Sequence, residues 1–210
     1  MPGMPGYQSL AGQVNGDLAV PPPEKGVVYY WPAVANASLA AVTTAFYGSA
    51  NSYLAIASLH DELAEEFKGK APEDVLARSE AFGRAVGVAV VRWAYGDGYE
   101  SLRACAYTVP TGPGLWEPTP PGNVANPLQP CWGRLRPFVL SSAGEFLPVP
   151  PDAYSTDKNS KMYKLAMEVF DAKKNLTPEQ ETIALYWADD PGTTGTPPGH
   201  SIAIATQLLR

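Results

Sequence analysis

The chain has 210 residues, a formal net charge of −6 and 22 prolines. This length is enough to bury a core, and one domain is the default. The acidic balance argues against a nucleic-acid partner, because a phosphate backbone requires a clustered basic surface. The prolines gather in residues 21–23, 110–130 and 148–151, which predicts ordered loops between helices rather than general disorder.

Residues 27–59 contain no charged side chain. A membrane span needs about 20 predominantly apolar residues, whereas here Asn36, Thr43 and Asn51 interrupt a run that is mostly alanine. We therefore expect a buried core helix and no membrane span. Residues 1–26 are rich in glycine and proline and are expected to be irregular. The sequence thus predicts an N-terminal segment, 1–26, followed by a helical domain, 27–210.

Apolar periodicity predicts an all-α fold, a helical bundle with a long proline-rich connecting loop. The expected helices cover residues 33–47, 53–67, 72–93, 157–172, 178–189 and 198–210. Residues 99–155 show little periodicity and form the long connection, with a short extended piece expected at 136–140. Such a length without regular structure is typical of a functional or wrapping loop.

Several helices show a single apolar stripe, which we expect to face the core. The stripes are Ile56, Leu59, Leu63 and Phe67 in the second helix, Val75, Phe82, Val86 and Trp93 in the third, and Met162, Leu165 and Val169 in the fourth. Gly83 and Gly87 lie one turn apart in the third helix. They either allow a neighbouring helix to approach closely or are simply tolerated small residues. Thr177 and Gln180 form a capping-box pattern around Pro178, which predicts a helix start there.

Two proline- and tryptophan-rich motifs are the most distinctive segments: Trp116–Pro121 (WEPTPP) and Trp132–Phe138 (WGRLRPF). Together with Gly6–Gln13 (GYQSLAGQ) and Thr196–Ser201 (TPPGHS), they resemble the amino-terminal half of bacterial vanadium-dependent haloperoxidase-like proteins. That family belongs to the type 2 phosphatidic acid phosphatase superfamily. The resemblance runs from about residue 6 to the end and implies that the catalytic motifs lie downstream of Arg210. The last helix shows no stop signal before that residue.

The resemblance implies a bound tetrahedral oxyanion, vanadate or phosphate, held by cationic side chains. It also implies a histidine that acts as a metal ligand or as a nucleophile. Its motifs are a lysine followed seven positions later by Arg-Pro, then Ser-Gly-His, then an arginine with a histidine nearby. Arg136–Pro137 is similar to the end of the first motif, but Gln129 occupies the lysine position. Pro198–His200 is similar to the second, with proline in place of serine. Both segments also lie closer to the N-terminus than the corresponding motifs do in that family. We interpret Arg136 as scaffold and His200 as a helix-start residue, so each is a weak catalytic candidate.

Other candidate sites are weaker still. His60 lacks the second histidine of a His-Glu-x-x-His zinc helix, which favours an exposed acidic helix face. The pairs Asp61 with Glu65 and Asp189 with Asp190 lack the alternating ligands of a calcium loop, so no metal site is expected. Gly192–Gly195 lacks the Gly-Lys-Ser/Thr ending of a phosphate loop. The aromatic set that includes Trp116, Trp132 and Trp187 would line a ligand groove for a carbohydrate or an aromatic molecule. The favoured alternative is that these side chains anchor the long loop to the core.

The two cysteines, Cys105 and Cys131, would form a disulfide between two proline-rich loops in an exported protein. The alternative is two unrelated buried thiols, and the spacing does not decide between them. The resemblance implies export to the periplasm or beyond, although Met1–Gly6 contains no signal-peptide pattern.

Two functions follow from the sequence. The first is the scaffold half of a vanadium haloperoxidase-like or acid-phosphatase-like enzyme, with no cofactor in this chain and vanadate only where the C-terminal half is present. The second is a non-catalytic, exported structural or interaction module that assembles with itself or with a second chain. In both, a C-terminal half, a second chain or a homo-oligomer completes the fold.

Overall fold

The structure, a computed structural model, describes residues 3–190 and 194–208. The chain divides into two compact units. The first unit comprises Met1–Pro110 and Glu117–Pro148, and the second comprises Thr111–Trp116 and Val149–Arg210. The expected all-α fold is confirmed: residues 3–190 and 194–208 contain helices and no β-strand, and Lys68 and Ala71 form an isolated bridge. The expected division into residues 1–26 and 27–210 stays a prediction. Residues 3–30 contain turns and bends and no helix.

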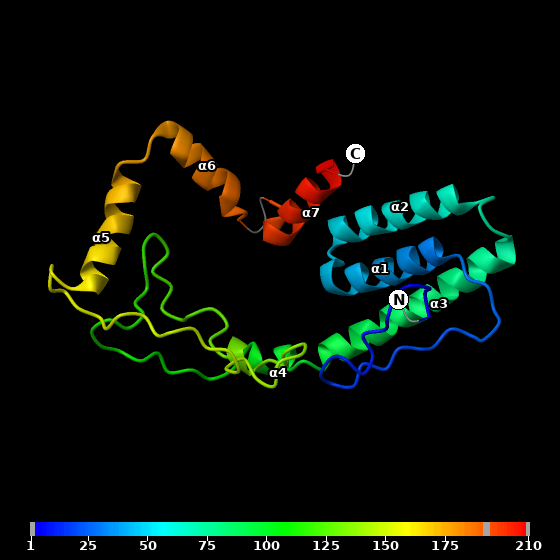
Figure 1. The fold of residues 1–210 in the computed structure, drawn as a ribbon, viewed down its shortest axis with the longest axis horizontal. Coiled ribbons are helices and arrows are strands. Elements are labelled where there is room, and N and C mark those ends of the chain that lie inside the picture. Colours follow the sequence, from blue (N-terminus) through cyan, green and yellow to red (C-terminus); the bar gives the residue numbers. More distant parts are fainter. Residues whose placement is uncertain (1–2, 191–193, 209–210) are drawn as a thin grey trace. The chain divides into compact units, whose positions relative to one another are not determined.

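The first unit is built on α1 (Trp31–Tyr47), α2 (Ala50–Phe67) and α3 (Glu73–Tyr95). Helix α1 lies between the other two and packs against both (Figure 1). This position agrees with its sequence, which is apolar or small on all sides. A helix that is buried on two faces cannot carry charge there without a large desolvation penalty.

Close contact between α1 and α3 depends on two glycines. A Cβ added at Gly83 would overlap the backbone oxygen of Val34, and one at Gly87 would come within 2.7 Å of the Ala41 Cβ and 2.8 Å of the Ser38 oxygen. The interpretation that these glycines allow a helix to approach closely is therefore confirmed. Nearby, the buried Ser79 hydroxyl accepts a hydrogen bond from the backbone N–H of Tyr30 (2.9 Å). This bond ties the start of α1 to the middle of α3.

The core of the first unit is small. Val34, Phe82 and Val86 form its buried cluster, and Val20, Tyr29 and Trp31 pack around them. The predicted α3 stripe is thus confirmed at Phe82 and Val86. The Tyr29 ring contacts Phe82 at a centroid distance of 4.9 Å, so the segment before α1 closes one end of the core.

Two expectations for α2 are wrong. The helix begins at Ala50, not at residue 53, because the chain break is confined to Gly48 and Ser49. Leu59, placed in the inward stripe by its spacing, is 58% exposed. The inward face of α2 is rotated away from Leu59 and includes His60, whose backbone oxygen accepts a hydrogen bond from the Asn36 side chain (2.9 Å).

The long connection contains two short helical pieces, α4 (Tyr99–Leu102) and η1 (Trp132–Arg134). A disulfide joins Cys105 to Cys131, with their Cα atoms 6.5 Å apart. Cys131 is buried, and the bond therefore holds the beginning of η1 near the end of α4. Within residues 136–140 the structure has bends rather than a strand.

The second unit contains α5 (Lys161–Lys174), α6 (Pro178–Ala188) and α7 (Thr196–Leu208). The capping box predicted at Thr177 and Gln180 is confirmed. Helix α5 begins four residues later than predicted because Asp157 forms a turn instead, accepting the backbone N–H of Asn159 on its side chain. The predicted helix at residue 198 begins at Thr196, and Arg210 lies outside the described residues.

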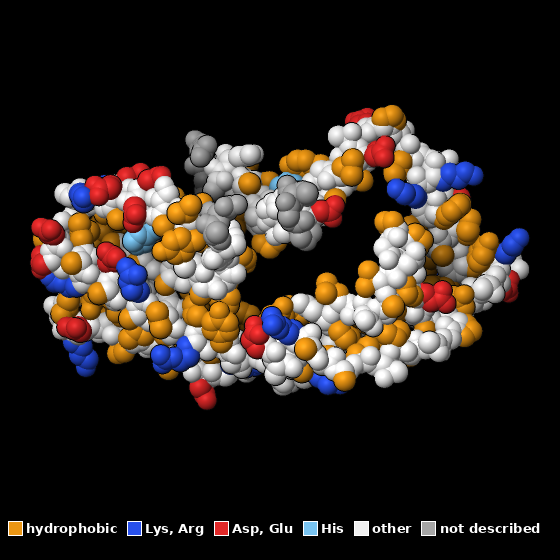
Figure 2. All heavy atoms as spheres, turned by 180° about the vertical axis from the view of Figure 1, so that it is seen from behind, with side chains coloured by type: hydrophobic (Ala, Val, Ile, Leu, Met, Phe, Trp, Pro, Cys, Tyr) orange, Lys and Arg blue, Asp and Glu red, His pale blue; other side chains and the backbone are white. Residues whose placement is uncertain are grey.

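The apolar faces of the second unit are exposed. Leu165 and Val169 of α5, expected to point inward, are exposed, and Figure 2 shows hydrophobic side chains at the surface along α5 and α6. Trp187 of α6 is 59% exposed. Trp116 and Trp132 are exposed as well, so the expectation that these tryptophans anchor the long loop to a core is wrong. Periodicity shows which face is apolar but not whether another segment covers it.

In the part of the chain that the structure describes, no helix is both long enough and apolar enough to cross a bilayer. The uncharged stretch 27–59 is divided between α1 and α2, with a break at Gly48 and Ser49. Neither part matches the length of about 20 apolar residues that a span requires.

Candidate functional site

Arg136 is held by the end of α3. Its guanidinium lies over the Trp93 ring, with the Cζ atom 4.6 Å from the ring centroid. Nη2 donates a hydrogen bond to the Trp93 backbone oxygen (2.7 Å), and Nη1 donates to the Gly16 oxygen (3.4 Å). The backbone N–H of Arg136 donates to the oxygen of Asp97 (3.0 Å). The last carbonyls of a helix carry partial negative charge, and Arg136 donates to one of them, the Trp93 oxygen, which also accepts the backbone N–H of Gly96 (3.2 Å).

These contacts fit a structural role for Arg136 better than an oxyanion-binding role. An arginine that binds vanadate or phosphate presents two parallel N–H donors to the ligand. Here the terminal nitrogens already donate to two backbone oxygens that come from different segments. The Nε atom is buried and has no hydrogen-bond partner among the described residues. The guanidinium therefore connects the N-terminal segment, α3 and the loop that carries it.

His200 is paired with a carboxylate in the second unit. Its Nδ1 atom lies 2.9 and 3.0 Å from the two carboxylate oxygens of Asp189. The side chains are 14% and 8% exposed, respectively. The imidazole stacks on Trp187 (4.8 Å, 22°) and meets the edge of Tyr186 (4.7 Å, 83°). Helix α6 supplies the two aromatic rings, its C-cap supplies Asp189, and the first turns of α7 supply His200.

Asp189 has a partner that its position in the sequence does not indicate. It was weighed as half of a carboxylate pair with Asp190, whereas its partner is His200, eleven positions further along the chain. Its backbone is left-handed, with φ 49°, and it forms the C-cap of α6. The sequence signal for this pair is weak: it consists of a histidine that follows two consecutive aspartates after a short loop.

The surroundings of His200 do not suit a bound oxyanion. Vanadate and phosphate need several cationic donors around them. Among the described residues, His200 contacts a carboxylate and two aromatic rings, and a carboxylate repels an anion. A carboxylate on Nδ1 fixes the ring orientation and its tautomer. The pair therefore docks α7 onto the end of α6. Of the Gly192–Gly195 segment, residues 192 and 193 lie outside the described residues.

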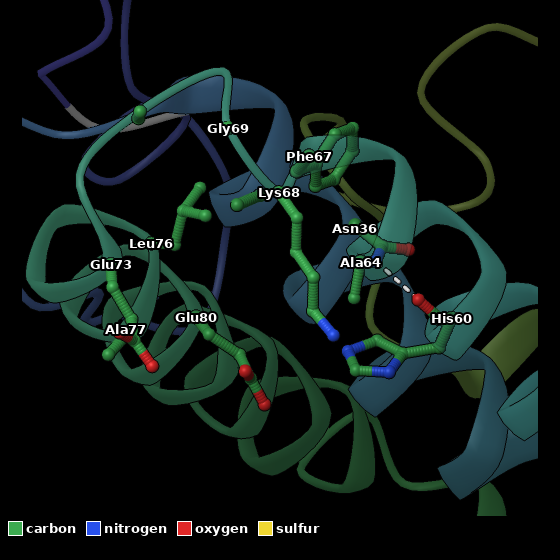
Figure 3. Close-up of a pocket in the computed structure, with 12 residues that line it drawn as sticks. Asn36, His60, Ala64, Phe67, Lys68, Gly69, Glu73, Leu76, Ala77 and Glu80 are labelled. Atoms are coloured by element: carbon green, nitrogen blue, oxygen red, sulfur yellow. Dashed lines mark hydrogen bonds between the residues drawn. The ribbon is translucent and has the colours of Figure 1, made fainter.

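A cleft between α2 and α3, with Ala33 and Asn36 of α1 also lining it, has a volume of about 520 Å³. Figure 3 shows the Lys68 ammonium directed toward the His60 imidazole, with Glu73 and Glu80 on the facing side from α3. The expectation that His60 lies on an exposed acidic face is wrong, because its side chain is 16% exposed and turned into this cleft. The acidic residues around it, such as Asp61 and Glu65, do point to solvent.

Three of the four ionisable side chains that line this cleft contact a neighbour close by in the sequence. His60 Nδ1 lies 3.1 Å from an Asp61 oxygen, Lys68 pairs with Glu65, and Glu80 pairs with Arg84. Among the residues the structure describes, no group of three or more His, Cys, Asp or Glu side chains is arranged to hold a metal ion. The cleft therefore has the volume of a small-molecule site without a converging set of ligands.

Comparison with solved structures identifies the fold. The chain is similar to a crystal structure described as the first bacterial vanadium-dependent iodoperoxidase, with 33% sequence identity and a TM-score of 0.72. The match covers 90% of this chain and 45% of that chain, so the chain spans less than half the length of the iodoperoxidase. No family model and no curated protein matches the sequence. The chain thus has the fold of part of a vanadium haloperoxidase-like protein.

Proposed function

We propose that this chain is the scaffold half of a vanadium haloperoxidase-like or acid-phosphatase-like enzyme that acts through a bound vanadate or phosphate. The similarity to the iodoperoxidase supports this proposal, because it extends over 90% of the chain at 33% identity. The scaffold half positions helices, and the oxyanion is held by residues outside these 210. Those residues correspond to the portion of the iodoperoxidase that the match does not cover.

The contacts of Arg136 and His200 support the proposal that the oxyanion is held by residues outside this chain. The terminal nitrogens of Arg136 donate to backbone oxygens, and His200 is paired with a carboxylate. Neither arrangement fits vanadate, which needs converging cations and an imidazole with a free nitrogen facing them. When bound elsewhere, vanadate would activate peroxide for halide oxidation.

The exposed apolar helices of the second unit support a completing partner. Leu165, Val169, Ile183 and Trp187 are all exposed, and large exposed apolar patches mark interaction surfaces. A helical segment that corresponds to the unmatched part of the iodoperoxidase would cover them. The disulfide between Cys105 and Cys131 supports export, since such bonds persist in oxidising compartments.

A second candidate function rests on the same exposed helices. If a second copy of this chain covers them, the protein is a non-catalytic, exported structural or interaction module. Both functions require an apolar partner for α5 and α6. They differ in whether that partner brings an oxyanion site.

The experiment isolates the protein from its native source, measures the denatured intact mass, and titrates it with vanadate under ⁵¹V NMR. The enzyme proposal predicts a mass well above that of 210 residues, or a tightly bound second chain, together with stoichiometric vanadate that phosphate displaces. The recombinant 210-residue chain is the matched control and should leave the vanadate signal unchanged. A native protein of 22.4 kDa that self-associates and binds no vanadate would instead establish the structural module.

A further inference from the structure

A second groove in the first unit is lined by aromatic side chains and has a volume of about 780 Å³. It is formed by the C-terminal ends of α1 and α3, by α4 and η1, and by the loop after η1. Its aromatic residues are Phe46, Tyr47, Tyr95, Tyr99, Trp132 and Phe138. This volume lies within the usual range of small-molecule sites, about 300–1,000 Å³.

The aromatic side chains of this groove are open to solvent. All except Tyr99 are between 45% and 69% exposed. Some contact one another: Phe46 lies 5.8 Å from Tyr95, and Tyr99 lies 6.1 Å from Trp132, between ring centroids. These contacts fix the walls of the groove, and Tyr47, Trp132 and Phe138 remain more than half exposed. Exposed aromatic residues that gather in one concave surface, rather than singly, indicate a binding site.

The charged groups of the groove favour a positively charged ligand. Two carboxylates, Asp97 and Glu100, line it together with one guanidinium, that of Arg136. The Asp97 Oδ1 atom accepts the backbone N–H of Tyr99 (2.7 Å). Its Oδ2 atom has no hydrogen-bond partner among the described residues. Glu100 faces Arg103 at 3.4 Å, but both side chains are more than half exposed, and water and salt screen such a pair.

One side chain of the groove already shows how it accommodates a cation. The Arg136 guanidinium lies over the Trp93 ring, which packs edge-on against Phe138 (5.2 Å). The hydrogen-bond donors of that guanidinium point to backbone oxygens. The faces of aromatic rings carry partial negative charge and attract ammonium groups within about 6 Å. The rings that line the groove have the same property, and among the residues that the structure describes no Lys or Arg side chain lies over them.

We propose that this groove binds a small organic cation of the quaternary or alkylated ammonium class. Trp132, Tyr95 and Tyr47 would surround the apolar substituents of the ammonium group, and Asp97 would provide the opposite charge. The site lies entirely within the first unit, so it does not depend on the proposed oxyanion chemistry or on the partner of the second unit.

The test is isothermal titration of the full chain with choline and with 3,3-dimethylbutan-1-ol, which has the same shape but no charge. We expect choline to bind. The neutral alcohol should bind at least about tenfold more weakly, because it lacks the attraction between the cation and the rings. Trp132→Ala should weaken choline binding by about 2- to 30-fold. Trp116→Ala is the matched control, since Trp116 is similarly exposed but belongs to the second unit.

Three results would overturn the proposal: equal affinity for choline and its neutral analogue, no heat of binding with millimolar choline, or unchanged choline binding in Trp132→Ala. Binding of methyl glucoside in preference to choline would identify a carbohydrate site instead.

Asp97→Asn keeps the acceptor for the Tyr99 N–H and removes the charge. It should therefore weaken the binding of choline and leave the binding of the neutral analogue unchanged. Circular dichroism verifies the fold of each variant. Tyr47→Ala replaces Trp132→Ala if the latter fails to fold.

Discussion

The two units of the chain differ in what holds them together. The first unit has a buried cluster of Val34, Phe82 and Val86, with two glycines that allow α1 and α3 to touch. In the second unit, Asp189 is the only buried residue among those described, and it is a carboxylate. Hydrophobic burial therefore stabilises the first unit, whereas the second relies on capping, on one polar pair and on whatever covers its exposed helices.

Replacement of a core aromatic residue in the first unit should have the largest effect on stability, and a matched replacement in the second unit should have a small one. Phe82→Ala removes a ring that is packed on Tyr29 and Trp31, and core Phe→Ala changes cost about 3–5 kcal/mol. We expect a loss of that size in the free energy of unfolding, measured by urea denaturation with circular dichroism.

The matched change in the second unit is Trp187→Ala, at a side chain that is more than half exposed. Its cost should stay below about 1 kcal/mol in the isolated chain. If Trp187→Ala were as destabilising as Phe82→Ala, the second unit would have a core of its own, and the contrast between the units would be wrong.

Removal of the disulfide should have the next largest effect. Cys105 and Cys131 are 26 residues apart in sequence, and closing a loop of that length stabilises a fold by about 3 kcal/mol in the chain-entropy model. The double change Cys105→Ser with Cys131→Ser should lower stability by about that amount. Mass spectrometry after thiol labelling without reductant checks the bond itself, because labelled cysteines in the wild-type chain would show that it is absent.

The His200–Asp189 pair tests whether the second unit depends on one polar contact. His200→Ala leaves a buried carboxylate without its partner, and such a group costs about 1–3 kcal/mol. We expect faster amide hydrogen exchange in α6 and α7, with α1 and α3 unaffected. The reference variant is Ser201→Ala, one residue further along the same helix and exposed. Equal exchange in both variants would mean that the pair does not hold α7 to α6.

The sequence predicts features that depend on local interactions. Thr177 and Gln180 are three residues apart, and their capping box forms without help from the rest of the fold. The α3 stripe at Phe82 and Val86 is correct because α1 covers it. Leu165 and Val169 show the limit of the same method, since their spacing is equally regular while the described residues leave them exposed.

The candidate sites were harder to predict because they combine distant residues. Arg136 contacts Gly16 and Trp93, and these contacts span up to 120 residues of sequence. Asp189 and His200 are joined across a loop whose conformation no local pattern fixes. Trp132 was expected in the core, and it lines a groove formed by α1, α3, α4, η1 and the loop after η1.

The smallest expected effect concerns a turn in the loop of the first unit. The Ser141 backbone N–H donates to the Glu145 carboxylate, and this bond, with a further one from the Ser141 side chain, lowers the pKa of Glu145 below its usual 4.5. Because the folded pKa is lowered, the turn gains stability above the ordinary glutamate pKa and loses it as pH falls through the lowered value. An NMR titration should show the Ser141 amide and the Glu145 carboxyl changing together, below pH 4.5. Glu145→Gln should abolish the shift at Ser141. A carboxyl that titrates at its usual value would show that the turn does not persist in solution, although the core around Phe82 would be unaffected.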